Sequence, residues 1–296
     1  MALIAVTEDR VPTRQRLARA LADLPQGAPV VIMLHGLKYD PDLPLRDPFQ
    51  QIFALHPASQ SKRIVSWPRR LGLRGANALG IGYGWRARGT LWQAHRRAGR
   101  TAAPLAHLIR RIKDVDPARP IHLIAHSLGA RVALHAVTLL PAASVNRIIL
   151  ITAAAFECEL TRAMASPAGQ QAEFINIRSR ANTLFDILLR LALPHWGKTL
   201  GRGRLQARNL LDLCIDNGHS RRVLTKAGFA FAEKTAPICH WSGYLRRDAC
   251  ALYRAMLHRP DTTPLPYLQN LLRKPQAGFF SFPGFSGPRS GISANQ

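Results

Sequence analysis

The stretch Ile121-His-Leu-Ile-Ala-His-Ser-Leu-Gly-Ala-Arg-Val-Ala-Leu-His135 decides the fold. Its apolar first part predicts a buried strand, Ser127 falls at a tight turn, and the residues that follow predict a helix. This is the G-x-S-x-G pattern with Ala125 in place of the first glycine. Small residues such as Ala125 and Gly129 are needed there because strand and helix come close together. The pattern predicts that the Ser127 hydroxyl stands above a sheet edge as a nucleophile.

A second signal lies earlier, in Val30-Val-Ile-Met-Leu-His-Gly-Leu-Lys38, an apolar strand that ends in His-Gly. An oxyanion hole needs two backbone N–H groups directed at the developing alkoxide. We expect one from Leu128, directly after the serine, and the other from Leu37, since Gly36 lets the loop turn toward the site. We interpret His35 as a residue that braces this loop and lines the pocket.

A third signal is a late histidine, in Cys239-His-Trp-Ser-Gly-Tyr-Leu245. A base on a loop at this point can hang over Ser127 and accept its proton, so we favour His240 as the general base. His219 is its competitor. His126 is expected to point away from the serine, and we place it with Trp241 among the pocket residues.

The order of these signals, a His-Gly loop, a serine elbow and a late histidine, resembles the α/β-hydrolase superfamily, and more narrowly bacterial serine esterases and lipases. The resemblance covers roughly residues 28–257. It implies one domain over residues 1–258, in which 194–235 form a cap or an irregular insertion. We expect residues 259–296, which include a Pro-, Gly- and Ser-rich stretch, to be a disordered tail.

The resemblance also implies an acid between the serine and the histidine. Near Asn182, where it is expected, the sequence has no carboxylate. Asp186, about one helical turn later, ranks first as the residue that orients the imidazole, although it could instead pair with Arg190 at the surface. Glu157 and Asn182 remain as further candidates, and Asn182 would act through a neutral hydrogen bond.

Strand-like and helix-like segments alternate along the chain. We expect strands at 2–7, 29–34, 63–67, 121–125, 146–153 and 174–177, and helices at 14–24, 91–115, 130–140, 184–193 and 248–257. The glycine-rich segment 80–85 is expected to form a turn beside the pocket. Apolar strands that alternate with helices indicate an α/β fold, of the α/β-hydrolase type, with a mostly parallel sheet covered by helices on both faces.

Charge and cysteine content bear on location and partners. The chain has 41 Lys and Arg against 17 Asp and Glu, a net charge of +24. The arginines are dispersed and no nucleic-acid-reading motif accompanies them, so we expect weak, non-specific attraction to polyanions or anionic lipids. The four cysteines have no regular spacing. The sequence shows no apolar run of the roughly 18–20 residues that a spanning helix needs and no recognisable signal peptide. Together these features predict a cytoplasmic protein.

These features predict a serine hydrolase that cleaves an ester or related acyl bond through a Ser-His-acid triad. We expect no cofactor and no metal site, and a small acyl substrate that could be anionic. The sequence does not define the oligomeric state. Two rival functions stay open, a degenerate hydrolase fold that serves as a basic binding module, and an acyltransferase or thioesterase that uses the same triad.

Overall fold

The computed structural model describes residues 3–58, 61, 63–194, 197–202, 205–229, 231 and 238–273. Its strands form one sheet in the order β1-β3-β2-β4-β5-β6-β7, and every neighbouring pair is parallel. The expected parallel sheet is confirmed. The strands are β1 Leu3–Thr7, β2 Val30–Leu34, β3 Leu79–Gly84, β4 Ile121–His126, β5 Arg147–Ile151, β6 Glu173–Arg178 and β7 Leu210–Cys214.

Alternation along the strands divides the core into two layers, because successive side chains of a strand point to opposite faces. In β2, Ile32 belongs to one apolar cluster, whereas Val31 and Met33 belong to the other. In β4, Leu123 and Ile124 are divided in the same way. The strands are apolar on both faces because helices cover both.

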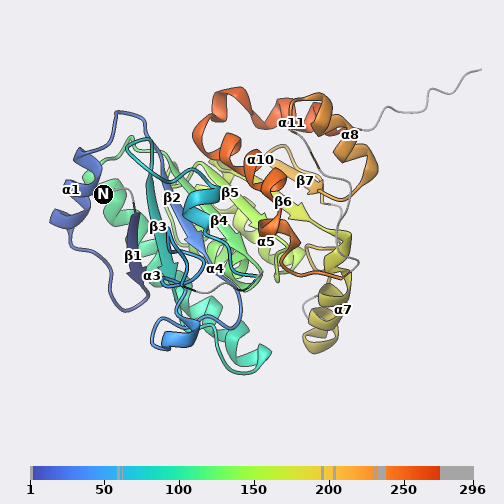
Figure 1. Ribbon diagram of the computed structural model, residues 1–296, viewed down its shortest axis with the longest axis horizontal. Helices are drawn as coiled ribbons and strands as arrows, with labels where there is room; N and C mark the ends of the chain where they lie inside the picture. The colour runs from blue at the N-terminus through green and yellow to red at the C-terminus, as the bar shows by residue number, and fades with distance from the viewer. Residues whose placement is uncertain are drawn as a thin grey trace, which may run out of the picture.

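Two groups of helices cover the two faces of the sheet. Buried side chains assign α1 Arg14–Ala22, α3 Leu91–Val115, α4 Leu128–Val137, α5 Glu157–Ala165 and α6 Pro167–Gln171 to the first layer. The second layer contains α2 Trp67–Arg70, α8 Gly218–Lys226, α9 Ser242–Leu245, α10 Arg247–His258 and α11 Leu265–Leu272. Figure 1 shows α8, α10 and α11 gathered near β7, and α7 (Thr183–Ala192) beside the lower right of the sheet.

Within residues 1–258, three expectations for local structure are wrong. Residues 63–67 form no strand, and α2 begins at Trp67. The glycine-rich segment 80–85, expected to be a turn, lies largely within β3 between β1 and β2, where Gly82 packs against Phe53. Segment 194–235, expected to be a cap or an irregular insertion, contributes β7 and α8 to the main fold. Sequence periodicity missed β3 because glycine has a low strand propensity, and it missed β7 because that strand contains the polar Asp212.

The chain beyond residue 258, expected to be disordered, forms the 3-10 helix Pro260–Thr262 and then α11 as far as the structure describes it. Arg147, 1% exposed at the start of β5, holds this segment in place. Its guanidinium donates to the carbonyls of Met256 and Thr263, 2.6 and 3.0 Å away. Leu265 and Leu268 are buried against the second layer. Residues 274–296 of the predicted tail lie outside the described residues.

The register of the sheet brings the strand ends together at one edge. Leu34 of β2 pairs with Ala125 of β4, and His126 pairs with Ile151 of β5. The residues that follow these strands therefore meet at the carboxyl edge, where ligand sites of open parallel sheets form. Ser127 is one of them.

Candidate active site

Ser127 lies in a strained turn between β4 and α4. Its backbone has φ 55° and ψ −124°, a region that residues with a side chain rarely adopt. Its N–H donates to the carbonyl of Ile151, 3.1 Å away, and its own carbonyl accepts from the N–H groups of Ala130 and Ala154. These bonds hold the strained turn in place and present the hydroxyl at the sheet edge.

Two glycines make this turn possible because backbone and side chains come very close. At Gly129 a Cβ atom would lie 2.6 Å from the carbonyl oxygen of His35, and at Gly36 it would lie 2.6 Å from the Cβ of Ser127. Ala125, which stands where the usual motif has glycine, is fully buried in β4. The His-Gly loop and the serine elbow are therefore packed directly against each other, as expected from the sequence.

The imidazole of His240 is within hydrogen-bond distance of the serine. Its Nε2 lies 2.8 Å from Ser127 Oγ, and its Nδ1 lies 2.5 Å from the side-chain oxygen of Asn182. An amide oxygen can only accept, so Nδ1 carries the proton and Nε2 is free to accept the serine proton. Asn182, one of the two further candidates from the sequence, therefore occupies the position that we expected for Asp186.

Asp186 lies behind Asn182 as seen from His240, in the first turn of α7. Its carboxylate accepts a hydrogen bond of 3.1 Å from Asn182 Nδ2, and it is 3% exposed. Burial raises the pKa of Asp186 to about 6, although the hydrogen bond from Asn182 opposes the rise. Asp186 thus orients the amide that orients the imidazole, and the four side chains form a chain from Ser127 to Asp186.

Glu157 and His219, the remaining candidates for the acid and the base, lie elsewhere. Glu157 begins α5, and its backbone N–H bonds the carbonyl of Lys198. His219 lies in the first turn of α8, where its N–H bonds the side chain of Asn217. Among the described residues, no hydrogen bond links Glu157 to His240 or His219 to Ser127.

Two donors fix the loop that carries His240. The carbonyl of His240 accepts from His126 Nε2 at 3.1 Å and from Thr152 Oγ1 at 3.2 Å. The ring of Phe185 covers the imidazole, with 4.8 Å between centroids, and the ring of Trp241 lies 6.1 Å from it. His126, placed among the pocket residues from the sequence, thus supports the backbone of His240.

Sequence reasoning missed Asp216, which holds the backbone around Asn182. Its carboxylate accepts from Ser179 Oγ at 2.7 Å and from the N–H groups of Arg180 and Ala181 at 2.9 and 3.3 Å. Burial acts to raise the pKa of Asp216, but these donors lower it overall, so the carboxylate is charged at neutral pH. The nearest sequence signal was the Asp216-Asn-Gly turn, which by itself does not indicate what the carboxylate binds.

His35 braces the loop beside the serine, as expected. Its Nδ1 donates to the carbonyl of Gly36, and its Nε2 accepts from the N–H of Trp85 at 3.1 Å. The Trp85 indole stacks on the imidazole and donates to the His35 carbonyl. Burial lowers the pKa of His35 to about 4, so the ring is a neutral brace at physiological pH.

The backbone N–H groups of Leu37 and Leu128 have no hydrogen-bond partner among the described residues. Leu128 is the first residue of α4, and the N-terminal amides of a helix favour a negative charge placed beside them. Leu37 follows Gly36, which touches the serine side chain. Both unbonded N–H groups therefore belong to residues that flank the serine turn.

Electrostatics favour a neutral base at this site. Burial lowers the pKa of His240 to about 4, and burial together with the neighbouring His240 charge lowers the pKa of His126 well below its ordinary value. A neutral His240 with its proton on Nδ1 can accept a proton from Ser127. The arrangement can perform nucleophilic catalysis.

Comparison with known protein families shows to which family the chain belongs. The model of a family described as "Alpha/beta hydrolase of unknown function (DUF900)" matches residues 15–175, more than half of the 296 residues. The match contains Ser127 and the His-Gly loop but ends before Asn182 and His240. No curated protein matches the chain. Among the described residues, no helix has the length and apolar character needed to cross a membrane.

Several solved structures are similar at low identity. TT1662 from Thermus thermophilus is 14% identical, with a TM-score of 0.38, over 85% of this chain and 92% of that chain. A lipase-esterase related protein from Clostridium acetobutylicum is 9% identical, with a TM-score of 0.35, over 69% and 93%. Trichoderma reesei cutinase, in complex with a phosphonate inhibitor, is 11% identical, with a TM-score of 0.30, over 82% and 88%.

Proposed function

Because the chain belongs to this family of α/β hydrolases, we propose that it is a serine hydrolase that cleaves an ester or related acyl bond. Ser127 is the nucleophile, His240 the general base, and Asn182 with Asp186 orients the base. The observation that carries the proposal is the 2.8 Å contact between Ser127 Oγ and an imidazole whose other nitrogen is held by an acceptor.

The reaction follows from which atoms can give and take a proton. Ser127 Oγ attacks the carbonyl carbon of the ester while its proton moves to His240 Nε2. The carbonyl oxygen becomes an oxyanion and accepts hydrogen bonds from the N–H groups of Leu37 and Leu128. The protonated imidazole then gives its proton to the leaving alcohol. The ester C–O bond breaks as the alcohol leaves, and the acyl group stays bonded to Ser127 Oγ. Water, deprotonated by the same imidazole, attacks this acyl carbonyl, and the imidazole returns the proton to Ser127 Oγ as the acid leaves.

Asn182 replaces the carboxylate that usually holds the base. A neutral amide can fix the tautomer and the orientation of the imidazole, as in papain-like sites, but it contributes no charge to stabilise the imidazolium. Asp186 supplies negative charge indirectly, because its carboxylate accepts a hydrogen bond of 3.1 Å from Nδ2 of the same Asn182 amide. This combination supports a working base with a weaker electrostatic contribution.

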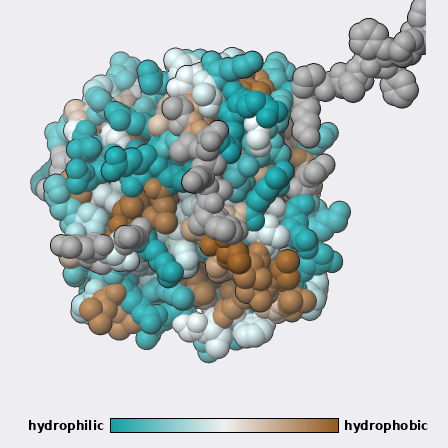
Figure 2. All heavy atoms as spheres, turned by 45° about the vertical axis from the view of Figure 1, so that its right-hand side comes forward, coloured by the Kyte–Doolittle hydropathy of each residue, from teal (hydrophilic) through white to brown (hydrophobic). Residues whose placement is uncertain are grey.

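An exposed apolar strip on α7, the helix whose Phe185 contacts His240, supports an apolar acyl group in the substrate. Leu184, Leu188 and Leu191 recur at helical spacing on α7 and are 44%, 52% and 71% exposed. The same helix carries Phe185, whose ring contacts His240. Figure 2 turns the side of α7 toward the viewer and shows hydrophobic side chains gathered low on that face. Apolar surface of this kind is available to an acyl chain.

Labelling with a fluorophosphonate probe tests the proposal, since such a probe reacts only with an activated serine. We expect the wild type to be labelled and to hydrolyse p-nitrophenyl butyrate. Ser127→Ala and His240→Ala should lose both properties by several orders of magnitude, with unchanged circular dichroism. His219→Ala is the matched control and should keep them. A wild type that is neither labelled nor active would refute the proposal and favour the alternative of a binding module.

A further inference from the structure

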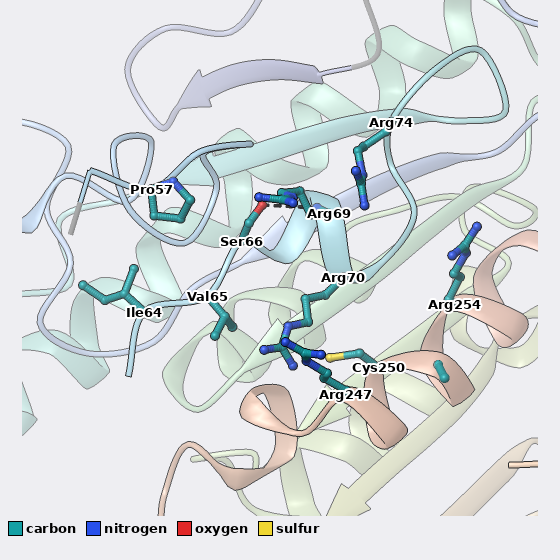
Figure 3. A pocket seen from close by; sticks show the side chains of 11 residues that line it. Pro57, Ile64, Val65, Ser66, Arg69, Arg70, Arg74, Arg247, Cys250 and Arg254 are labelled. Carbon is teal, nitrogen blue, oxygen red and sulfur yellow. Dashed lines mark hydrogen bonds between the residues drawn. The ribbon is translucent and has the colours of Figure 1, made fainter. Parts of the chain in front are cut away.

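A cavity away from the serine is lined by five arginines. It has a volume of about 590 Å³ and lies between α2 with its flanking loops and α10. Arg69 and Arg70 end α2 and Arg74 follows it, while Arg247 and Arg254 lie two turns apart on α10. Figure 3 shows these side chains reaching the same space from both sides.

The charge of this cavity is uncompensated within the described residues. No acidic residue lines it, and no ion pair there involves any of the five arginines. The neighbouring Arg246, in contrast, is paired with Asp248 at 2.6 Å. Another cavity, near β1 and β3, also contains arginines, but there Arg86 is paired with Asp9 and Asp42. The five arginines are therefore distinguished by lining one cavity that no carboxylate lines.

Four of these arginines are exposed and Arg70 is half-buried, so water screens part of the repulsion among the five guanidinium groups, and a bound anion would offset the rest. Arginine stays charged at every physiological pH, and a concave wall of low dielectric strengthens the field of like charges. Planar guanidinium groups bind phosphate oxygens through paired hydrogen bonds. The chemistry of the lining thus fits a ligand that carries one or more phosphate groups.

Parts of the lining are already held in position. Arg70 Nη1 donates to the carbonyl of Leu245 at 2.6 Å, which fixes that guanidinium at the rim. Arg254 lies against Gly72, where a Cβ atom would come within 2.6 Å of its Nε. Ser66 caps α2 by accepting from the N–H of Arg69. Such preorganisation lowers the entropy lost on binding.

We propose that the cavity between α2 and α10 binds a phosphate-bearing ligand through Arg69, Arg70, Arg74, Arg247 and Arg254. The apolar side chains of Pro57, Ile64 and Val65 form another part of the lining and leave room for a short apolar portion of the ligand. The site does not use Ser127, His240 or Asn182. It is therefore independent of the proposed hydrolase activity.

Pyrophosphate tests the site, with binding measured by titration calorimetry at constant ionic strength. We expect the wild type and Ser127→Ala to bind it equally, and Arg247→Gln/Arg254→Gln to bind it at least tenfold more weakly. Arg96→Gln/Arg100→Gln is the matched control, because it also removes two exposed arginines from one helix and should bind like the wild type. Thermal melts establish that each variant is folded.

Vesicles distinguish a free ligand from a lipid headgroup. Cosedimentation with phosphatidic acid vesicles that depends on Arg247 and Arg254 would identify the phosphate source as a lipid, and pyrophosphate binding without cosedimentation would identify a free phosphate compound. Equal losses in the two double variants would overturn the proposal in favour of general charge attraction. The absence of binding to both probes by the wild type would overturn it as well.

Discussion

Replacing Asn182 by alanine tests how the base is held. The change removes the acceptor that lies 2.5 Å from His240 Nδ1, and that ring becomes positively charged in the transition state. A hydrogen bond to a charged group contributes about 1.5–3 kcal/mol, and each 1.36 kcal/mol is a factor of ten in rate, so we expect a loss of about 10- to 150-fold. This is less than the roughly 10⁴-fold loss of a triad Asp-to-Asn change, because alanine does not impose the wrong tautomer.

The assay is the steady-state hydrolysis of p-nitrophenyl butyrate at pH 8, where His240 is neutral. The lost interaction is stronger in the transition state than in the ground state, so kcat should fall by about as much as kcat/KM. The melting temperature of the variant shows whether it is folded. Labelling by the fluorophosphonate probe should slow by a similar factor, because the same proton transfer activates the serine.

A double-mutant cycle with Asp186→Ala separates a direct role of Asp186 from one that acts through Asn182. In the structure Asp186 binds the amide and not the imidazole. The double variant should therefore be about as active as Asn182→Ala alone, since residues that act through one contact are not additive. Glu157→Gln is the control and should be within about twofold of the wild type. If Asp186→Ala costs as much in the Asn182→Ala background as in the wild type, or if Asn182→Ala is within about threefold of the wild type, the reasoning is refuted.

Three further outcomes follow from the site. Burial lowers the pKa of His240 to about 4, and the base must be neutral to accept a proton, so kcat/KM should fall only as the pH drops through about 4. A fall that begins between pH 6 and 7 would contradict the burial argument. Burial raises the pKa of Asp186 from 3.8 to about 6, so the folded state binds this proton more tightly than the unfolded state, and the stability that results is lost as the pH rises from about 4 to 6. Asp186→Asn should therefore raise the melting temperature more at pH 8 than at pH 4. Equal increases at the two pH values would contradict this prediction. Gly36→Ala would bring a Cβ atom within 2.6 Å of the Ser127 Cβ and should reduce probe labelling more than tenfold, whereas Gly218→Ala, where only Arg222 is near, should not.

The sequence by itself determined the serine elbow, the His-Gly loop and the late histidine. Each depends on a local pattern. An apolar strand that turns at Ser127 and leaves through Gly129 can be recognised from its own residues, and the close approach of Gly36 to the serine follows from the same small side chains. The alternation of apolar strands and amphipathic helices was likewise sufficient to predict a parallel sheet covered on both faces.

Only the tertiary structure decided which side chain meets the imidazole. Asn182 faces His240 because Asp216, from the loop after β7, holds the turn at residues 180–182 through Ser179 and two backbone amides. Asp186 follows four residues later, on the same side of α7, so it reaches the amide and not the ring. A spacing of one helical turn is visible in the sequence, but which of the two groups lies nearer to His240 depends on how a distant loop fixes the start of the helix.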